Sequence, residues 1–312
     1  MKIAYAKPWF DEREAEAVGR VLKGTSSEAY QEIVKFQDEF STYISPPGEN
    51  YYCLFTNSCT SALKLAWKYF KECKFRRYYR NLTPNTYCAT FESAEEIGLH
   101  LANDESTMRV ATHYGGILWD INRGAINIED SAHRIEPNDI LVSQIRCYSF
   151  HEGKNMACGF RSSGGMFVTK DKEIYEWAKL QLNDGRIGGT EAGYKVVAMA
   201  GGYEGDPIAA TIGRVQLTKL PAFDERRIEI RNMYNQAFNA DWQGTHLYPY
   251  FVKNTEQIKD LRIKLSEKGI ETSYHYPNID GTYRKDWLAV SLPIYPLLTN
   301  DEVEYIINAV LS

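Results

Sequence analysis

The sequence predicts an α/β protein: a three-layer α/β/α large domain with a mainly parallel sheet, followed by a small C-terminal α+β domain. Short apolar runs of strand type alternate with segments whose apolar residues recur at helical spacing, a pattern typical of a sheet covered on both faces. The chain has 312 residues, 44% of them hydrophobic and 25% charged. This composition supports a large buried core and excludes disordered and fibrous proteins.

The large domain is predicted to begin with a helix over 30–44, a strand over 51–55 and a second helix over 62–70. Each of these segments has the matching apolar period, and a polar turn, 56–58, separates the strand from the helix that follows it. Five further short apolar runs, bounded by turns or helical patterns, are strand candidates: 78–82, 110–113, 125–128, 145–150 and 165–168.

The small domain is predicted from a change of pattern near the C-terminus. A long helical segment over 208–238 is followed by a strand at 246–252 and by helices at 257–268 and 303–310. We therefore expect a large domain over 1–235 and a small domain over 236–312.

Charge and cysteine usage limit the partners and the compartment. The formal net charge is −5 with no basic block, so neither nucleic acid nor an anionic membrane is an expected partner. No window reaches the roughly 18 apolar residues of a membrane span, and the first residues lack a signal-peptide core. The six cysteines form no CxxC pair, which indicates free thiols in a reducing compartment, and we expect a cytoplasmic protein.

A strand-to-helix turn at 58–63 carries hydroxyls and backbone N–H groups at a helix N-terminus, where an anion such as phosphate is favoured. Simple capping of the helix by Ser58 or Thr60 also explains these residues.

A second cluster at 128–133 places Asp130 after an apolar strand, where the carboxylate suits a heteroaromatic nitrogen and His133 suits a phenolic oxygen. A helix cap for Asp130 and a partly buried histidine are the alternatives.

A third cluster, 147–155, places Lys154 in a turn just past a strand. Partial burial there would lower the pKa of Lys154 and allow the neutral amine to form a Schiff base, although most lysines are solvated surface charges. A fourth segment, 84–90, places Tyr87 in a strand-to-helix loop, where its ring can stack on a flat cofactor or pack in the core. Together these four segments offer a phosphate-binding turn, an acid for a ring nitrogen, an amine nucleophile and a stacking ring. A site for pyridoxal 5′-phosphate (PLP) needs these four parts.

Seven segments resemble, in order, motifs of the DegT/DnrJ/EryC1/StrS family, which comprises PLP-dependent sugar aminotransferases of the aspartate aminotransferase fold (fold type I). Residues 58–63 resemble SGTAAL, 84–90 P-x-TF-x-AT, 113–116 HLYG, 128–133 IEDxAH, 149–155 SFHxxKN, 210–217 AAxGxxQL, and 291–299 SLPLYPxLT. The resemblance covers nearly the whole chain.

The resemblance implies a homodimer with shared active sites and a role for each matching residue. Lys154 would form the Schiff base with PLP, Asp130 would pair with the pyridine nitrogen, and His133 would lie near the 3′ oxygen. Ser149, Thr60 and the backbone of Cys59 would hold the phosphate, and Tyr87 would stack on the ring. His275, Tyr276 and Arg161 are candidate substrate residues.

The chain departs from the family pattern at three places. Cys59 replaces a glycine, 159–165 replaces the GEGG segment, and 202–204 replaces the NYR motif. The resemblance implies amino transfer from an amino acid, with glutamate expected, to a nucleotide-linked keto sugar. A dehydratase or a non-sugar acceptor is the alternative within PLP chemistry, although family dehydratases replace the lysine by histidine. The alternative outside PLP chemistry is a non-catalytic member of the family that keeps the fold for binding or regulation.

Overall fold

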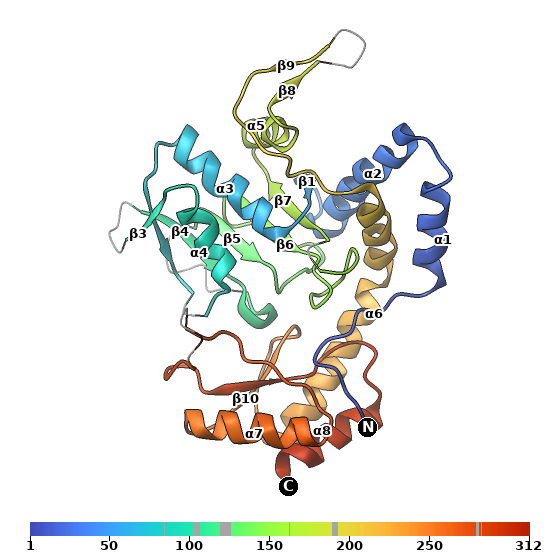
Figure 1. Ribbon diagram of the computed structural model, residues 1–312, viewed down its shortest axis with the longest axis vertical. Coiled ribbons are helices and arrows are strands. Elements are labelled where there is room, and N and C mark those ends of the chain that lie inside the picture. Colours follow the sequence, from blue (N-terminus) through green and yellow to red (C-terminus); the bar gives the residue numbers. More distant parts are fainter. Residues whose placement is uncertain are drawn as a thin grey trace.

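The computed structural model describes residues 1–83, 85–102, 107–118, 126–161, 163–188, 193–278, 281 and 283–312 (Figure 1). Its helices are α1 (Glu12–Val21), α2 (Ser26–Ile44), α3 (Cys59–Cys73), α4 (Cys88–Glu95), α5 (Lys172–Leu182), α6 (Pro207–Phe238), α7 (Thr255–Glu267), α8 (Asn300–Leu311) and the 3-10 turn η1 (Tyr114–Gly116). Its strands are β1 (Tyr52–Thr56), β2 (Tyr78–Asn81), β3 (His100–Leu101), β4 (Met108–Thr112), β5 (Ile128–Ser131), β6 (Ile145–Ser149), β7 (Gly165–Thr169), β8 (Arg186–Ile187), β9 (Lys195–Val196), β10 (Tyr248–Phe251) and β11 (Ala289–Leu292).

A seven-stranded sheet in the order β1-β7-β6-β5-β4-β2-β3 forms the centre of the large domain. Strand β7 is antiparallel to both β1 and β6, whereas β6, β5, β4, β2 and β3 are paired in parallel. The six strands other than β7 therefore point the same way, and their carboxyl ends lie at one edge, where ligands bind in open α/β sheets. The predicted mainly parallel sheet is confirmed.

Two apolar cores cover the two faces of this sheet. One joins α2 and α6 to β1, β6 and β7 around buried aromatic rings such as Phe36, Phe40 and Phe150. The other joins α3, α4 and α5 to the opposite face and contains Trp67 and Tyr79. The large domain thus has the three layers that the sequence predicts.

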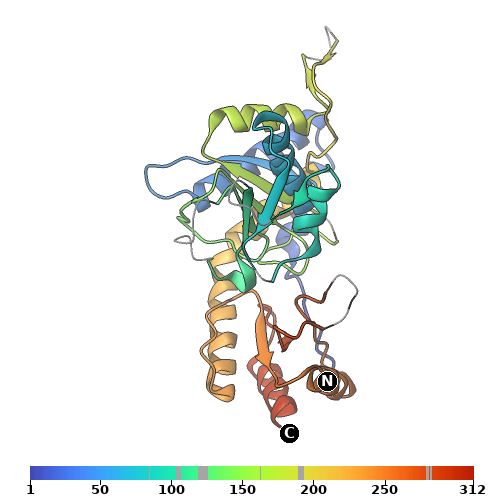
Figure 2. The same cartoon turned by 90° about the vertical axis from the view of Figure 1, so that its left-hand side faces the viewer.

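A third core holds the small domain together. It lies among α7, α8 and the antiparallel pair β10–β11, and α6 extends into it from the large domain (Figures 1 and 2). Ile3, Ile230 and Tyr234 also belong to this core, and Ile3 forms an isolated parallel bridge with Ile270. The N-terminal residues therefore pack with the small domain.

The elements agree closely with the sequence pattern where the period is strong. The helix predicted over 208–238 is α6, and the strand predicted over 145–150 is β6. The strand predicted at 125–128 begins instead at Ile128 and extends through Asp130 to Ser131, and Ala125 lies outside the described residues. In the part of the chain that the structure describes, no helix is long and apolar enough to cross a membrane.

Candidate active site

A cavity of about 650 Å³ lies at the carboxyl edge of the sheet, between the large and the small domain. Most of the residues singled out from the sequence line it, although they come from separate elements. Its walls include Ser58, Cys59, Thr60, Tyr87, Asp130, Ser149, Lys154, His246, His275 and Tyr276. The topology therefore brings these sequence clusters together.

The N-terminus of α3 points its first turn toward this cavity. The Ser58 side chain caps the helix by accepting a hydrogen bond from the Ser61 N–H at 3.1 Å, so the predicted capping role of Ser58 is present. The amides of Cys59 and Thr60 belong to the first turn, whose N–H groups have no intrahelical acceptor. Gly165 packs directly beneath this turn, and a Cβ atom at that position would lie 2.4 Å from the Cys59 nitrogen.

Asp130 is buried and held by two hydrogen bonds. Its Oδ2 accepts from the Thr90 hydroxyl at 2.6 Å, and its Oδ1 accepts from the Ala132 N–H at 3.0 Å. Thr90 is linked in turn to the Thr86 hydroxyl, and Thr86 to that of Thr112. Asp130 belongs to strand β5 and caps no helix, so this row of hydroxyls fixes the carboxylate in the cavity wall.

Lys154 lies in the turn after β6, half-buried at the cavity. Burial lowers the pKa of Lys154 to about 8, against the opposing effect of the Asp130 carboxylate. The turn is fixed because the Lys154 N–H donates to the His151 carbonyl and the Arg227 guanidinium donates to the Lys154 carbonyl at 3.2 Å. Compared with an ordinary lysine, a much larger share of the Lys154 amine is therefore unprotonated near neutral pH, about a tenth at pH 7, and able to act as a nucleophile or base.

His133 lies behind the cavity wall, and both of its ring nitrogens have partners. The Gly115 N–H donates to Nδ1 at 3.2 Å, and Tyr276 Oη lies 2.8 Å from Nε2. The His246 ring stacks on His133 with 4.2 Å between ring centroids. Burial lowers the pKa of His133 well below its usual value, with a further contribution from the positive charge of Lys154, so the ring is neutral.

The remaining predicted residues occupy distinct positions. Ser149 is buried at the end of β6 and accepts a hydrogen bond from the His151 N–H, and Tyr87 precedes α4 with its ring 5.4 Å from that of Tyr276. His275 lines the cavity and contacts the Ser291 hydroxyl at 2.8 Å, and burial lowers its pKa to about 3. Arg161 is exposed outside the cavity lining, with its charge acting on His151. Pro84 of the 84–90 segment lies outside the described residues.

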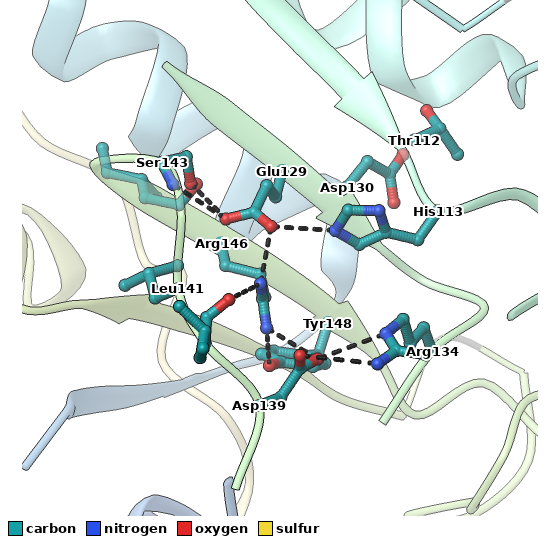
Figure 3. A network of polar contacts seen from close by, with 12 residues as sticks. Thr112, His113, Glu129, Asp130, Arg134, Asp139, Leu141, Ser143, Arg146 and Tyr148 are labelled. Carbon is teal, nitrogen blue, oxygen red and sulfur yellow. Dashed lines mark hydrogen bonds and ion pairs between the residues drawn. The ribbon is translucent and has the colours of Figure 1, made fainter. Parts of the chain in front are cut away.

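A second polar cluster lies beside this site, centred on Glu129 (Figure 3). Glu129 accepts hydrogen bonds from Arg146 at 2.6 Å and from the Ser143 hydroxyl at 2.6 Å, and contacts His113 at 2.9 Å. Arg146 is itself fully buried and also pairs with Asp139 at 2.9 Å. Since neighbouring strand residues point to opposite faces, this network anchors β5 through Glu129 while Asp130 faces the cavity.

Sequence reasoning missed three cavity-side residues. His246 and Tyr5 line the cavity, and Tyr114 donates a hydrogen bond to the His275 carbonyl at 2.8 Å. His246 is the first residue of the strand predicted at 246–252, and its position at the start of that apolar run was the only sequence signal for a site role. Tyr5 carries no local signal, because an N-terminal segment reaches this cavity only through the fold.

The sequence profile of the DegT/DnrJ/EryC1/StrS aminotransferase family matches residues 8–102 and 128–311. The chain belongs to this family. This protein is therefore a PLP-dependent aminotransferase of fold type I.

Individual relatives are distant but extend over the full chain. The spore coat polysaccharide biosynthesis protein SpsC of Bacillus subtilis is 23% identical, covering 99% of this chain and 96% of its own. An uncharacterized protein of Methanocaldococcus jannaschii, MJ1066, is 24% identical, with 97% and 95% covered. Among solved structures, PseC of Helicobacter pylori, an aminotransferase involved in pseudoaminic acid biosynthesis, superposes with a TM-score of 0.84 at 21% identity, covering 100% of this chain and 98% of that chain. The putative sugar aminotransferase Spr1654 of Streptococcus pneumoniae, in its PLP form, gives a TM-score of 0.83 at 20% identity, covering 99% and 98%.

Proposed function

We propose that this protein transfers an amino group from an amino acid, with glutamate as the expected donor, to a nucleotide-linked keto sugar. The observation that carries the proposal is the pairing of a half-buried Lys154, whose pKa is lowered to about 8, with a buried Asp130 in one cavity of an aminotransferase fold. The sugar acceptor is supported by relatives named for polysaccharide and pseudoaminic acid biosynthesis.

The cavity residues suit PLP in charge and shape. The amides of Cys59 and Thr60 and the Ser149 hydroxyl would hold the phosphate, since a helix N-terminus favours an anion. Asp130 would pair with the ring nitrogen, because its carboxylate is already oriented by Thr90 and Ala132. Gly165 allows this turn to pack closely on β7, because a Cβ atom at that position would lie 2.4 Å from the Cys59 nitrogen.

When bound, PLP supplies an electron-accepting ring that stabilises negative charge on the reacting substrate carbon. Lys154 would act as the general base and then the general acid that moves a proton between the substrate carbon and the cofactor. Asp130 keeps the ring nitrogen protonated because a buried carboxylate favours a cation beside it. His275 and Tyr276, contributed by the small domain, would meet the substrate inside the cavity, whereas Arg161, which is exposed outside the cavity lining, would contact only a part of the substrate that extends beyond it. The proposed assembly is a cytoplasmic homodimer with shared sites.

The test begins with the purified protein and its Lys154→Ala variant. Wild-type protein should be yellow, and borohydride should fix the cofactor on the peptide that contains Lys154, as read by mass spectrometry. Glutamate with a panel of nucleotide-linked keto sugars should then yield 2-oxoglutarate, and the variant should lose turnover by at least a thousandfold. Normal turnover by the variant, or a colourless wild-type protein after incubation with PLP, would reject the proposal.

A further inference from the structure

The orientation of His133 fixes the direction of a hydrogen-bond chain that reaches the cavity. Its Nδ1 accepts from the Gly115 N–H, so this nitrogen carries no proton. In the neutral ring the proton is then on Nε2, which donates to Tyr276 Oη at 2.8 Å. His133 therefore has no free donor for a ligand.

The His133 ring is held in this arrangement from several sides. The stacked His246 ring lies 4.2 Å from the His133 ring between centroids, and the backbone N–H of His246 donates to the Gly115 carbonyl at 3.1 Å. The same Gly115 residue supplies the backbone N–H that binds His133. Lys154, His246 and His275 are the titratable groups whose charges act on His133, and all three disfavour its protonation. A flip of the ring would break the bonds to Gly115 and Tyr276 together.

Tyr276 continues the chain into the cavity. Its hydroxyl oxygen accepts from His133, and among the residues that the structure describes no acceptor is placed for the hydroxyl proton. Burial, together with the nearby Tyr114 and Asp130, raises the pKa of Tyr276, so the phenol keeps its proton. The ring contacts those of Tyr87 and His275, at 5.4 and 4.9 Å between centroids, which restricts its movement.

We propose that Tyr276, rather than His133, donates the hydrogen bond to the ring hydroxyl oxygen of bound PLP, with His133 as the positioning residue that orients it. The inference rests on the cofactor assignment of the proposed function and goes beyond it by giving a small-domain residue a place in the cofactor site. Tyr276 lines the cavity beside Asp130 and Tyr87, the residues suited to the nitrogen and the face of the same ring.

The test compares Tyr276→Phe with Tyr248→Phe, which removes a tyrosine hydroxyl bonded to Asn235 in the small-domain core. Apoprotein of each is titrated with PLP and with 3-deoxypyridoxal 5′-phosphate, which lacks the ring oxygen. Tyr276→Phe should bind PLP about tenfold more weakly, the effect of losing one hydrogen bond to a charged group. Its affinity for the deoxy compound should equal that of wild type, and Tyr248→Phe should bind both like wild type.

A second readout is the pH at which the visible absorbance of the bound cofactor changes. A hydrogen bond donated to the ring oxygen stabilises the negative charge of that oxygen. The oxygen then attracts the proton on the Lys154 nitrogen less strongly, so the pKa of this nitrogen falls. Tyr276→Phe should therefore move this midpoint upward by about one pH unit. If Tyr276→Phe binds PLP and the deoxy compound equally more weakly than wild type, or if the midpoint does not move, the proposed role of Tyr276 is wrong and the proposed function is unaffected. Absence of PLP binding by wild-type protein would instead overturn the proposed function as well.

Discussion

At the scale of single residues, the lowered pKa of Lys154 predicts how cofactor attachment depends on pH. Below a pKa of about 8 most of the amine is protonated, so the rate at which Lys154 takes up PLP should rise with pH and level off above about 8. Absorbance-monitored mixing of apoprotein with PLP between pH 6 and 9.5 measures this. Since the Asp130 carboxylate raises the pKa of Lys154, Asp130→Asn should move the midpoint to lower pH. A midpoint near the ordinary lysine value of 10.5 would contradict this interpretation.

The sequence predicts single residues well when the motif is local. Lys154 and Asp130 each follow or end an apolar run, and both lie at the cavity. The bond between His133 and Tyr276 joins residues 143 positions apart and depends on how the small domain meets the sheet, so no local pattern contains it.

At the scale of elements, helix α3 couples local stability to the cavity through its cap. Ser58→Ala should lower the unfolding free energy by about 1 kcal/mol, because the Ser61 N–H loses its acceptor, and the melting temperature by roughly 2–4 °C. Ser58→Gly should cost only a few tenths of a kcal/mol. Thermal unfolding followed by circular dichroism separates the two variants, and equal losses would show that Ser58 acts through something other than capping.

Element prediction succeeded where the apolar period is long and failed where tertiary contacts define the strand. Helix α6 follows its pattern over 32 residues. Strand β3 has only two residues, His100 and Leu101, both exposed, and it forms because β2 offers a parallel edge. The antiparallel direction of β7 likewise follows from its position between β1 and β6 and has no signature in its sequence.

At the scale of the whole molecule, the Glu129 network predicts the response of stability to acid (Figure 3). Burial opposes ionisation of Glu129, but the contact with His113 and the charge of Arg146 outweigh it and lower the pKa of Glu129 from 4.5 to about 2. A lowered carboxyl pKa stabilises the folded state fully above the unfolded value of 4.5 and progressively less as pH falls toward 2. At pH 3.5 this one group should account for about 1 kcal/mol of the lost stability.

Glu129→Gln keeps the side-chain size but removes the charge, leaving the fully buried Arg146 with Asp139 as its carboxylate partner. The variant should be less stable at pH 7 by about 3 kcal/mol, since one partner of a buried ion pair is gone. Its stability should also fall less steeply than that of wild type between pH 5 and 3.5, because the titrating group is absent. Urea unfolding at several pH values measures both effects, and Glu304→Gln, at an exposed position of α8, is the matched control. Parallel pH profiles for wild type and Glu129→Gln would place the acid sensitivity in another part of the molecule.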